Sequence, residues 1–339
     1  MHHFVPSQVF VQPDALAYPA TRQATSKLKQ LGVPITVTSR VPAAGRELSP
    51  AERYREAKRT LSLRVRKELD FASCKPSAHY QLPLTSSCPG LCEYCYLSTT
   101  LGPGPYIRAY VNVEEILSRA EKYIQQRLPD ETYFEGAATS DPVPVEYLTG
   151  SLAKAIEFFA RQSKARFRFV TKFTDIDSLL KVEHGGHTRF RFSINSQHVI
   201  EKFEHGTPRL KARIAAANRV LHAGYPLGFL IGPILVFEHW EKAYAEMFEM
   251  LRDGLDEIIN ADVTFELITH RFTRRGKELQ LAVFPETELP LEEDERRFKF
   301  GQFGYGKFVY RKETMSQFDE YFTRTIGNMF PRARIEYLV

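Results

Sequence analysis

The sequence predicts an α/β fold in which a partial (β/α)6 TIM-type barrel forms the core. From residue 79 to about residue 275, short apolar runs typical of strands alternate with amphipathic helical patterns. Such alternation produces parallel βαβ units. Six strand runs fit in this length, whereas a closed barrel has eight strands in about 250 residues. The hydrophobic content of 43% is ample for a large core. We therefore expect an open, partial barrel.

Residues 1–78 are expected to form an N-terminal α/β extension. The runs Val5–Val11 and Val33–Val37 have strand character, and the pattern over Thr21–Leu31 between them predicts a helix. Residues 48–69 are densely charged. Such a run is typical of a solvated helix face and more rarely of a contact to phosphates.

Residues 79–275 are expected to form the barrel core. The strands are predicted at His79–Leu84, Thr132–Glu135, Arg166–Thr171, Arg189–Ile194, Leu227–Ile231 and Thr264–Thr269. The helices between them are predicted at Val113–Arg127, Val145–Arg161, Asp175–Leu180, Pro208–His222 and Trp240–Arg252. Loops at the carboxyl ends of such strands carry the chemistry of these folds, so polar residues that follow the strands are the first candidates for a site.

Residues 276–339 are expected to form a C-terminal region with a DNA-contacting β-hairpin. Aromatic and basic residues alternate around a glycine-rich centre at 301–306, which predicts one mainly aromatic face and one mainly cationic face. Phe303 and Tyr305 are candidate wedges between bases. The candidate phosphate contacts are Arg271, Arg274, Arg275, Arg296, Arg297, Lys307 and Arg311. For the arginines at 271–275, a solvated basic turn is the alternative.

Composition sets few further limits. The net charge of +5 at pH 7 allows a polyanionic partner without requiring one. The sequence has four cysteines, three of them in one motif, so a disulfide framework is not expected. No secretory signal opens the sequence and no apolar run approaches a membrane span, so we expect a cytoplasmic protein.

Cys88, Cys92 and Cys95 follow the first barrel strand with the spacing C-x3-C-x2-C. Thiolates bind zinc or iron–sulfur clusters, and three cysteines leave one iron of a four-iron cluster open to an outside ligand. We expect these three to be cluster ligands. The alternative is a zinc site in which Cys74 or His79 is the fourth ligand. Zinc sites more often use paired C-x2-C units, and only one is present.

Polar side chains also follow several predicted strands. The second strand leads into Gly136–Asp141, where small residues permit close backbone approach. Ser140 and Asp141 in this stretch offer hydrogen bonds to an ammonium or a carboxylate. Elsewhere, a polar residue at a strand end can neutralise a carboxylate, hydrogen-bond a ribose, or merely cap a helix. The candidates of this kind are Lys172, Ser193 and Asn195.

The stretch Cys88–Tyr96, in which Tyr94 directly precedes the last cysteine, resembles the motif of the radical S-adenosylmethionine enzymes. Within that superfamily the sequence looks most like the spore photoproduct lyases, on this motif, on Gly136–Asp141 and on residues 301–310. The resemblance runs over nearly the whole chain. It implies a [4Fe–4S] cluster and S-adenosylmethionine as cofactors. It also implies repair of 5-thyminyl-5,6-dihydrothymine in double-stranded DNA, with one electron from an unidentified reductant.

The resemblance also implies roles for single residues. Gly136–Asp141 would hold the methionyl part of the cofactor. In the family, a 5′-deoxyadenosyl radical takes a hydrogen atom from C6 of the lesion and the bridging bond breaks. A cysteine then returns a hydrogen atom to the thymine radical. Tyr94 and Tyr96 would relay the radical back toward the cofactor, and Tyr94 would also contact it.

One residue departs from the family pattern. The hydrogen-donating cysteine of the family falls at Ala138. An engineered variant, or an enzyme that lacks a step of the cycle, would show this pattern. Binding and the initial abstraction are expected to survive, while clean quenching of the thymine radical and turnover are in question.

Two other functions stay open at this point. One is a radical S-adenosylmethionine enzyme that acts on another substrate, although the basic and aromatic C-terminal region argues against a small molecule. The other is a zinc-stabilised nucleic-acid-binding protein without catalysis. Iron and sulfide analysis separates a cluster from zinc.

Overall fold

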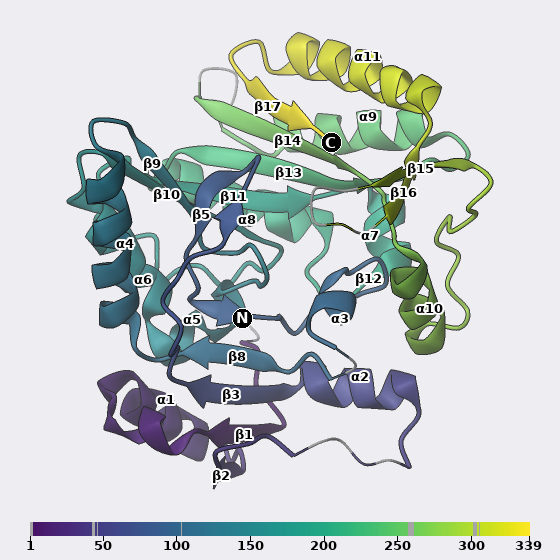
Figure 1. Cartoon of the computed structure of the whole chain (residues 1–339). Helices are drawn as coiled ribbons and strands as arrows, with labels where there is room; N and C mark the ends of the chain where they lie inside the picture. Colours follow the sequence, from purple (N-terminus) through teal and green to yellow (C-terminus); the bar gives the residue numbers. More distant parts are fainter. Residues whose placement is uncertain are drawn as a thin grey trace. The chain divides into compact units, whose positions relative to one another are not determined.

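The computed structural model describes residues 3–42, 45, 47–102, 104–256, 261–300, 304 and 306–339, with the backbone alone at residues 98 and 99. The chain forms two compact units, and Figure 1 labels most of their helices and strands. The first comprises Met1–Pro89, Gly104–Phe190 and His222–Pro226. The second comprises Gly90–Pro103, Arg191–Leu221 and Leu227–Val339.

The first unit contains a five-stranded sheet in the order β2-β1-β3-β8-β6. Neighbouring strands are parallel except β6 and β8, which are antiparallel. The strands are β1 (Gln8–Val11), β2 (Ile35–Val37), β3 (Thr60–Arg64), β6 (Thr85–Ser86) and β8 (Ile107–Tyr110). The helices that connect the first three are η1 (Pro13–Ala17), α1 (Pro19–Gln30) and α2 (Pro50–Lys58).

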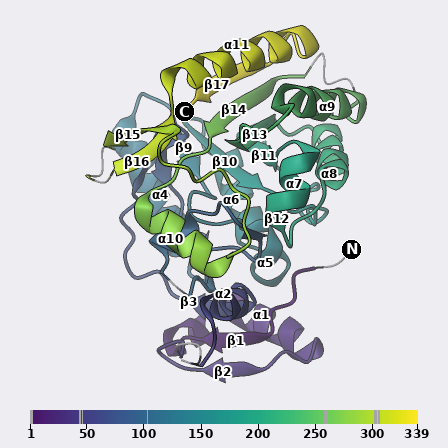
Figure 2. The ribbon, with the colours of Figure 1, turned by 90° about the vertical axis from the view of Figure 1, so that its right-hand side faces the viewer.

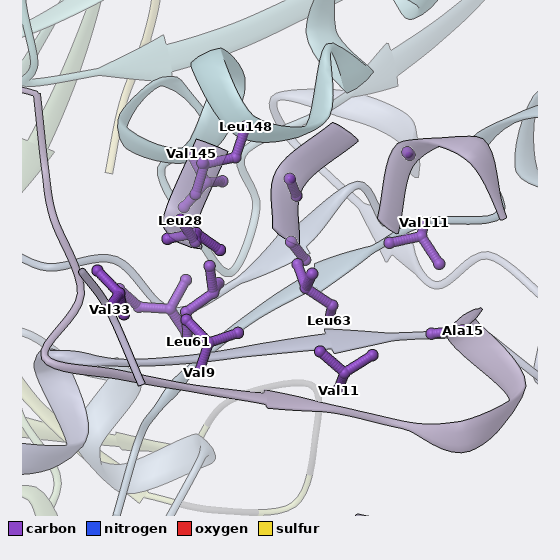
Figure 3. Close-up of a cluster of buried hydrophobic side chains, with 14 residues drawn as sticks. Val9, Val11, Ala15, Leu28, Val33, Leu61, Leu63, Val111, Val145 and Leu148 are labelled. Atoms are coloured by element: carbon purple, nitrogen blue, oxygen red, sulfur yellow. The ribbon is translucent and has the colours of Figure 1, made fainter. Parts of the chain in front are cut away.

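Apolar side chains of this sheet and of α1 form one core. Ala20, Ala24 and Leu28 recur every four residues along α1, so they share one face of the helix. They pack with Val9 of β1 and Leu61 of β3, all of them buried (Figure 3). The four-residue spacing of these apolar side chains therefore fixes which face of α1 meets the sheet.

The rest of the first unit alternates strands and helices. β5 (Ala78–Gln81), β9 (Thr132–Glu135) and β10 (Ala165–Thr171) are parallel neighbours, and β4 (Ser73–Cys74) is antiparallel to β5. The helices are α4 (Val113–Arg127), α5 (Val143–Thr149) and α6 (Ser151–Ala160). The bounds predicted for β9 and α4 are confirmed. The helix predicted at Val145–Arg161 is two helices, because Gly150 between them has a φ of +64°, which glycine adopts readily.

The helix predicted at Asp175–Leu180 is wrong. The segment forms turns, in which the amide of Leu179 donates to the carbonyl of Ile176 at 2.8 Å. The carbonyl of Leu179 accepts a hydrogen bond from the Tyr225 hydroxyl at 2.7 Å and another from the Val182 amide at 3.1 Å. These bonds replace the hydrogen bonds of a helix. A helix is costly to nucleate in so short a segment.

The second unit holds the parallel strands β13 (Leu227–Ile234), β14 (Val263–Thr269) and β17 (Arg334–Leu338). β11 (Thr188–Ile194), which enters this unit at Arg191, lies next to β13. β17 adds a strand that the sequence did not predict. The helices are α3 (Leu97–Thr100), α7 (Gln197–Phe203), α8 (Leu210–His222), α9 (Trp240–Asp253), α10 (Arg274–Val283) and α11 (Lys312–Met329). Two antiparallel pairs complete the unit: β7 (Leu91–Cys92) with β12 (Glu204–His205), and β15 (Arg296–Phe300) with β16 (Gly306–Tyr310).

Aromatic side chains pack α9 and α11 onto these strands. The ring of Phe248 in α9 lies 6.0 Å from that of Phe265 in β14 and 6.0 Å from that of Phe322 in α11. Arg191 and Glu266 form a fully buried ion pair between β11 and β14, with N–O distances of 2.7 and 2.6 Å. The Tyr337 hydroxyl donates to the same carboxylate at 2.6 Å. Glu266 thereby ties β17 to the inner strands.

The predicted division at residues 78 and 275 stays a prediction about domains. The first sheet combines strands from residues 8–11 with a strand from residues 107–110.

Among the described residues, no helix has the length and apolar character needed to cross a membrane.

Candidate active site

The first half of the cysteine loop is fixed in the first unit. Ser87 is fully buried and has a positive φ of 66°, which is uncommon for a residue other than glycine. Its amide donates to the carbonyl of Thr139 at 2.8 Å, and its hydroxyl donates to the carbonyl of Pro105 at 2.6 Å. The ammonium of Lys58, itself 1% exposed, donates to the carbonyl of Cys88 at 3.1 Å. Cys88 is therefore held beside the stretch that follows β9.

The second half of the loop is fixed in the second unit. Cys92 is buried and pairs with Glu204 across β7 and β12. The amide of Glu93 donates to the carbonyl of Phe203 at 2.9 Å. The amide of Cys95 donates back to the carbonyl of Cys92 at 3.1 Å, which turns the chain between the two thiols. Sequence predicted the three cysteines but not the strand that holds Cys92.

Tyr94 belongs to a buried network that the sequence did not reveal. Its hydroxyl donates to the carboxylate of Glu204, which also pairs with Arg213 at 2.5 Å. Arg213 further donates to the carbonyl of Ser193 at 3.0 Å, and both members of the ion pair have fully buried side chains. Burial, with the Glu204 carboxylate beside it, raises the pKa of Tyr94 well above its ordinary value. Tyr94 is therefore a neutral phenol with a hydrogen-bond acceptor in place.

Tyr96 differs from Tyr94 in its surroundings. Its side chain is 59% exposed in this structure. Glu93 lies between Cys92 and Tyr94 in the sequence. Its carboxylate accepts hydrogen bonds from the hydroxyl of Thr287 and from His205, the latter at 2.6 Å. Glu93 thereby ties the loop to the segment before β15. The two tyrosines named by the sequence thus occupy one enclosed and one open position.

The stretch Gly136–Asp141 begins where no side chain fits. A Cβ at Gly136 would stand 2.7 Å from the ring of Phe167, so this position requires glycine. At its other end, Asp141 is 8% exposed and accepts hydrogen bonds from the Thr171 hydroxyl and the Lys172 amide, both at 2.9 Å. Burial raises the pKa of Asp141 to about 6 against these bonds. Asp141 therefore joins the end of β10 to the loop after β9.

The remaining predicted cofactor contacts are also held within the protein. The Ser140 hydroxyl accepts from that of Thr85 at 2.7 Å. Asn195 is fully buried. Its side-chain amide donates through Nδ2 to the carbonyl of Pro233 at 2.8 Å, and its Oδ1 accepts from the backbone amide of Ser196 at 2.9 Å. The first unit brings Cys88, Ser140, Asp141 and Lys172 onto neighbouring segments. The second unit brings Cys92, Tyr94 and Ser193 around one network. Their roles toward a cofactor stay predictions.

The donor set fits an iron–sulfur cluster better than a zinc ion. None of the four cysteines forms a disulfide. The ring of His79, a candidate fourth zinc ligand, accepts from the Tyr133 amide at 2.9 Å and contacts Arg127 at 3.2 Å. A cluster spreads its cysteines around a larger centre, and three thiols in one loop match that chemistry.

The C-terminal hairpin has the predicted separation of its faces. β15 and β16 form an antiparallel pair (Figure 2). In their register, Phe298 lies opposite Phe308, and Lys299 lies opposite Lys307. Phe300 is 73% exposed. Burial lowers the pKa of Lys307, as do the nearby charges of Arg271 and Lys299. The hairpin therefore presents a cluster of cations beside exposed aromatic rings, and Lys299 is a member that the sequence analysis missed.

Arg296 is placed differently from the other predicted phosphate contacts. It is 8% exposed, donates to the carbonyls of His270 and Pro290 at 3.0 Å each, and stacks 3.6 Å from the ring centre of Tyr310. This burial argues against a phosphate contact from Arg296. An exposed arginine at the start of α10, Arg274, is paired with Glu293 at 3.3 Å.

The remaining candidate DNA contacts are either exposed arginines or residues outside the described part of the chain. Arg311 donates to the backbone carbonyl of Asp294. Arg271, Arg275 and Arg297 are exposed. Phe303 and Tyr305 lie outside the described residues, so the structure does not place the two candidate wedges.

Known proteins are similar to this chain over nearly its whole length. The model of the family described as spore photoproduct lyase matches residues 4–339. The spore photoproduct lyase of Clostridium acetobutylicum is 46% identical over 335 residues, which cover 98% of both chains. A solved spore photoproduct lyase complexed with dinucleoside spore photoproduct is similar over the whole of both chains, with a TM-score of 0.96 and 45% identity. This likeness confirms the predicted α/β class with a partial TIM-type barrel.

A second solved spore photoproduct lyase is a double mutant with bound AdoMet and dinucleoside spore photoproduct. It has a TM-score of 0.96 and 46% identity, and each chain is covered completely. One cysteine is replaced by alanine and one serine by cysteine, with the new cysteine 64 residues before the new alanine. Cys74 precedes Ala138 by the same 64 residues. A third solved lyase has a tyrosine-to-phenylalanine substitution 42 residues before that alanine position, as Tyr96 precedes Ala138 here.

Proposed function

The chain belongs to the spore photoproduct lyase family, and we propose from this that it repairs the spore photoproduct in DNA. The reaction reverses 5-thyminyl-5,6-dihydrothymine to two thymines, so the protein is a carbon–carbon lyase. The observation that carries this function is the likeness over the full chain to a lyase solved with the dinucleoside lesion. Cleavage of one carbon–carbon bond with no net redox change matches the cofactors of the family.

The cofactors are a [4Fe–4S] cluster and S-adenosylmethionine, as in the radical S-adenosylmethionine enzymes to which the family belongs. Cys88, Cys92 and Cys95 would hold the cluster. When bound, the two cofactors together supply the 5′-deoxyadenosyl radical that takes a hydrogen atom from the lesion. The chain's own residues then have to fix the loop, exclude water and return the hydrogen atom.

Buried polar groups fix the loop on both sides of Gly90. Lys58 and Ser87 hold the carbonyl and the backbone at Cys88 through bonds of 2.6 to 3.4 Å. Glu204 accepts from the Tyr94 hydroxyl and is itself neutralised by Arg213. A phenol that gives up its hydrogen atom needs a nearby group to stabilise the proton, and Glu204 is positioned to do so for Tyr94.

We also propose that the hairpin contacts double-stranded DNA around the lesion. Chemistry on a stacked base requires its removal from the duplex, at a cost of a few kcal/mol. Exposed rings such as Phe298 and Phe300 can offset that cost by filling the gap, and Phe303 and Tyr305 remain candidate wedges. The proposed phosphate contacts are Arg271, Arg275, Arg297, Lys299 and Lys307. From the DNA substrate we infer a cytoplasmic location, and we propose an unidentified one-electron reductant as the source of the electron.

Anaerobic reconstitution tests this function. The chain is loaded with iron and sulfide and mixed with S-adenosylmethionine, dithionite and the dinucleoside spore photoproduct. We expect loss of the lesion with formation of thymine and cleavage of the cofactor, and neither in a Cys92→Ala variant. Cofactor cleavage with an untouched lesion would point to another substrate. A colourless protein that binds zinc and no iron would sink the lyase assignment.

A further inference from the structure

We propose that the face of the first sheet opposite α1 binds single-stranded DNA, by stacking unpaired bases on its tyrosines and contacting phosphates with its arginines. The sheet is β2-β1-β3-β8-β6, and the surface uses none of the residues of the hairpin. Part of the charged run at residues 48–69 lies on this face. The inference rests on the proposed function only for the choice of DNA as the nucleic acid.

One face of this sheet is covered and the other is not. Val9 and Leu61 point to the side on which α1 packs, and both are buried (Figure 3). Side chains alternate along a strand, so the residues between them point to the opposite side. There Phe10, Arg64 and Tyr110 are only half-buried. Parallel strands normally have both faces covered, so a half-open face on this sheet indicates a binding surface.

This open sheet face is cationic and aromatic. Its strand positions include no Asp or Glu, and they are Gln8, Phe10, Thr36, Thr60, Ser62, Arg64, Ser86, Arg108 and Tyr110. The register of β3 and β8 places Arg64 opposite Tyr110. Tyr106 and Arg66, next to these strands, extend the face because they contact Arg108 and Tyr110. Positive charge without carboxylates is complementary to a phosphate backbone.

The arginines of the open sheet face lie over its tyrosine rings. Arg108 is 4.1 Å from the ring centre of Tyr106, and Arg66 is 5.5 Å from that of Tyr110. Arg64 donates to the Tyr106 hydroxyl at 3.1 Å. The other two arginines donate to a serine hydroxyl and a backbone carbonyl, and none of these hydrogen bonds neutralises a charge. The face therefore keeps three positive charges among rings that are held in place.

This arrangement fits a single strand better than a duplex or an acidic protein. Proteins bind single strands by combining a cationic surface with aromatic rings on which bases stack. Guanidinium planes stack on bases as well, so each pair of arginine and tyrosine serves both purposes. A duplex hides its base faces inside the stack, and an acidic protein would use the charges alone. The proposed repair takes a base out of the duplex, which leaves unpaired nucleotides for such a face.

Fluorescence anisotropy of the apo protein with a labelled oligothymidylate measures this binding. Arg64→Gln with Arg66→Gln should lower the slope of log affinity against log salt by about 0.7 for each lost phosphate contact. Tyr110→Leu should weaken binding by roughly fivefold or more at an unchanged slope, because a stacked base is lost. The same losses should appear in a chain that already carries Lys299→Gln and Lys307→Gln, since the hairpin is a separate contact.

Two matched controls accompany these variants. Arg22→Gln with Lys29→Gln removes two exposed cations from α1, on the covered side of the same sheet. Tyr133→Leu removes an exposed tyrosine of β9. Both controls should bind the oligothymidylate as the parent does, with the same slope.

Photo-crosslinking finds the stacked rings without any substitution. An oligothymidylate that contains 5-iododeoxyuridine crosslinks to an aromatic ring against its base. Peptide mapping of the parent should place the adducts on Tyr106 or Tyr110. This result does not depend on the folding of a variant.

Crosslinks that avoid residues 106–110, or an affinity and slope equal to those of the parent in all face variants, would overturn the proposal. Loss in the arginine variant alone, with Tyr110→Leu equal to the parent, would overturn it too, because the face would then bind any polyanion. Turnover of the dinucleoside lesion by the loaded parent reports on the proposed function instead. A parent that leaves that lesion untouched contradicts the repair activity, while the binding data decide the open sheet face independently.

Discussion

The hydroxyl of Tyr94 donates a hydrogen bond to the carboxylate of Glu204, a residue 110 positions later in the sequence. Arg213 holds that carboxylate from the other side at 2.5 Å. The cysteine loop and the strand β12 are therefore joined by this hydrogen bond as well as by the backbone pairing of β7 and β12, and a buried charge pair holds its acceptor, Glu204. Removal of one partner of such a pair leaves an unpaired charge in a low-dielectric interior.

We predict that Glu204→Gln destabilises the protein by roughly 3 kcal/mol, since Arg213 then lacks its counter-charge. Chemical denaturation of the apo protein measures the change. The matched control is Glu201→Gln on the neighbouring helix, where an exposed glutamate pairs with Arg209 at 3.4 Å and should matter by less than about 1 kcal/mol. Equal stability of the two variants would show that the buried pair is not structural.

A second prediction concerns pH. Burial raises the pKa of Asp141 to about 6 from an ordinary value of 3.8, so the folded state disfavours its charged form. The contribution of Asp141 to stability is full below pH 3.8 and is lost as the pH rises through 6, by about 3 kcal/mol in total. The free energy of unfolding of the parent should therefore fall relative to that of Asp141→Asn between these pH values. The exposed Asp319→Asn should run parallel to the parent, and a parallel Asp141→Asn curve would refute the shift.

A third prediction concerns the glycine at the start of the loop after β9. In Gly136→Ala the new methyl group would meet the ring of Phe167 at 2.7 Å, so we expect a loss of about 1–3 kcal/mol and impaired lesion binding. Gly327→Ala is the control, because a Cβ added at this position inside α11 would have nothing within 4 Å. That variant should gain about 0.5–1 kcal/mol. Thermal unfolding of both variants checks the contrast.

A fourth prediction concerns the hairpin and DNA. Replacement of Lys299 and Lys307 by Gln should weaken binding to lesion-bearing duplex and lower the slope of log affinity against log salt by about 0.9 for each lost phosphate contact. Binding titrations at several salt concentrations give the slope. Lys122→Gln, an exposed lysine of α4, is the control and should leave it unchanged. An unchanged slope in the double variant would exclude a phosphate contact from this face of the hairpin.

The sequence alone determined the local features of this protein. The spacing of Cys88, Cys92 and Cys95 identified the candidate cluster ligands, and alternation of apolar runs gave the class and the bounds of β9 and α4. It also gave the two faces of the hairpin. Each of these features is written in a period of a few residues, because strands and helices repeat their side-chain directions over that distance.

Only the tertiary structure decided which polar groups are consumed inside the fold. In the sequence, Arg296 and Lys307 are both basic residues of the hairpin and both are candidate phosphate contacts. In the structure, Arg296 is buried over Tyr310, whereas Lys307 lies among other cations. The pairing of Glu204 with Tyr94, and the link from the turn after Cys74 to Ala137 through Glu135, join residues far apart in the chain. The physical reason is that the fate of a charge or a thiol depends on burial and on its neighbours in space, which no local pattern records.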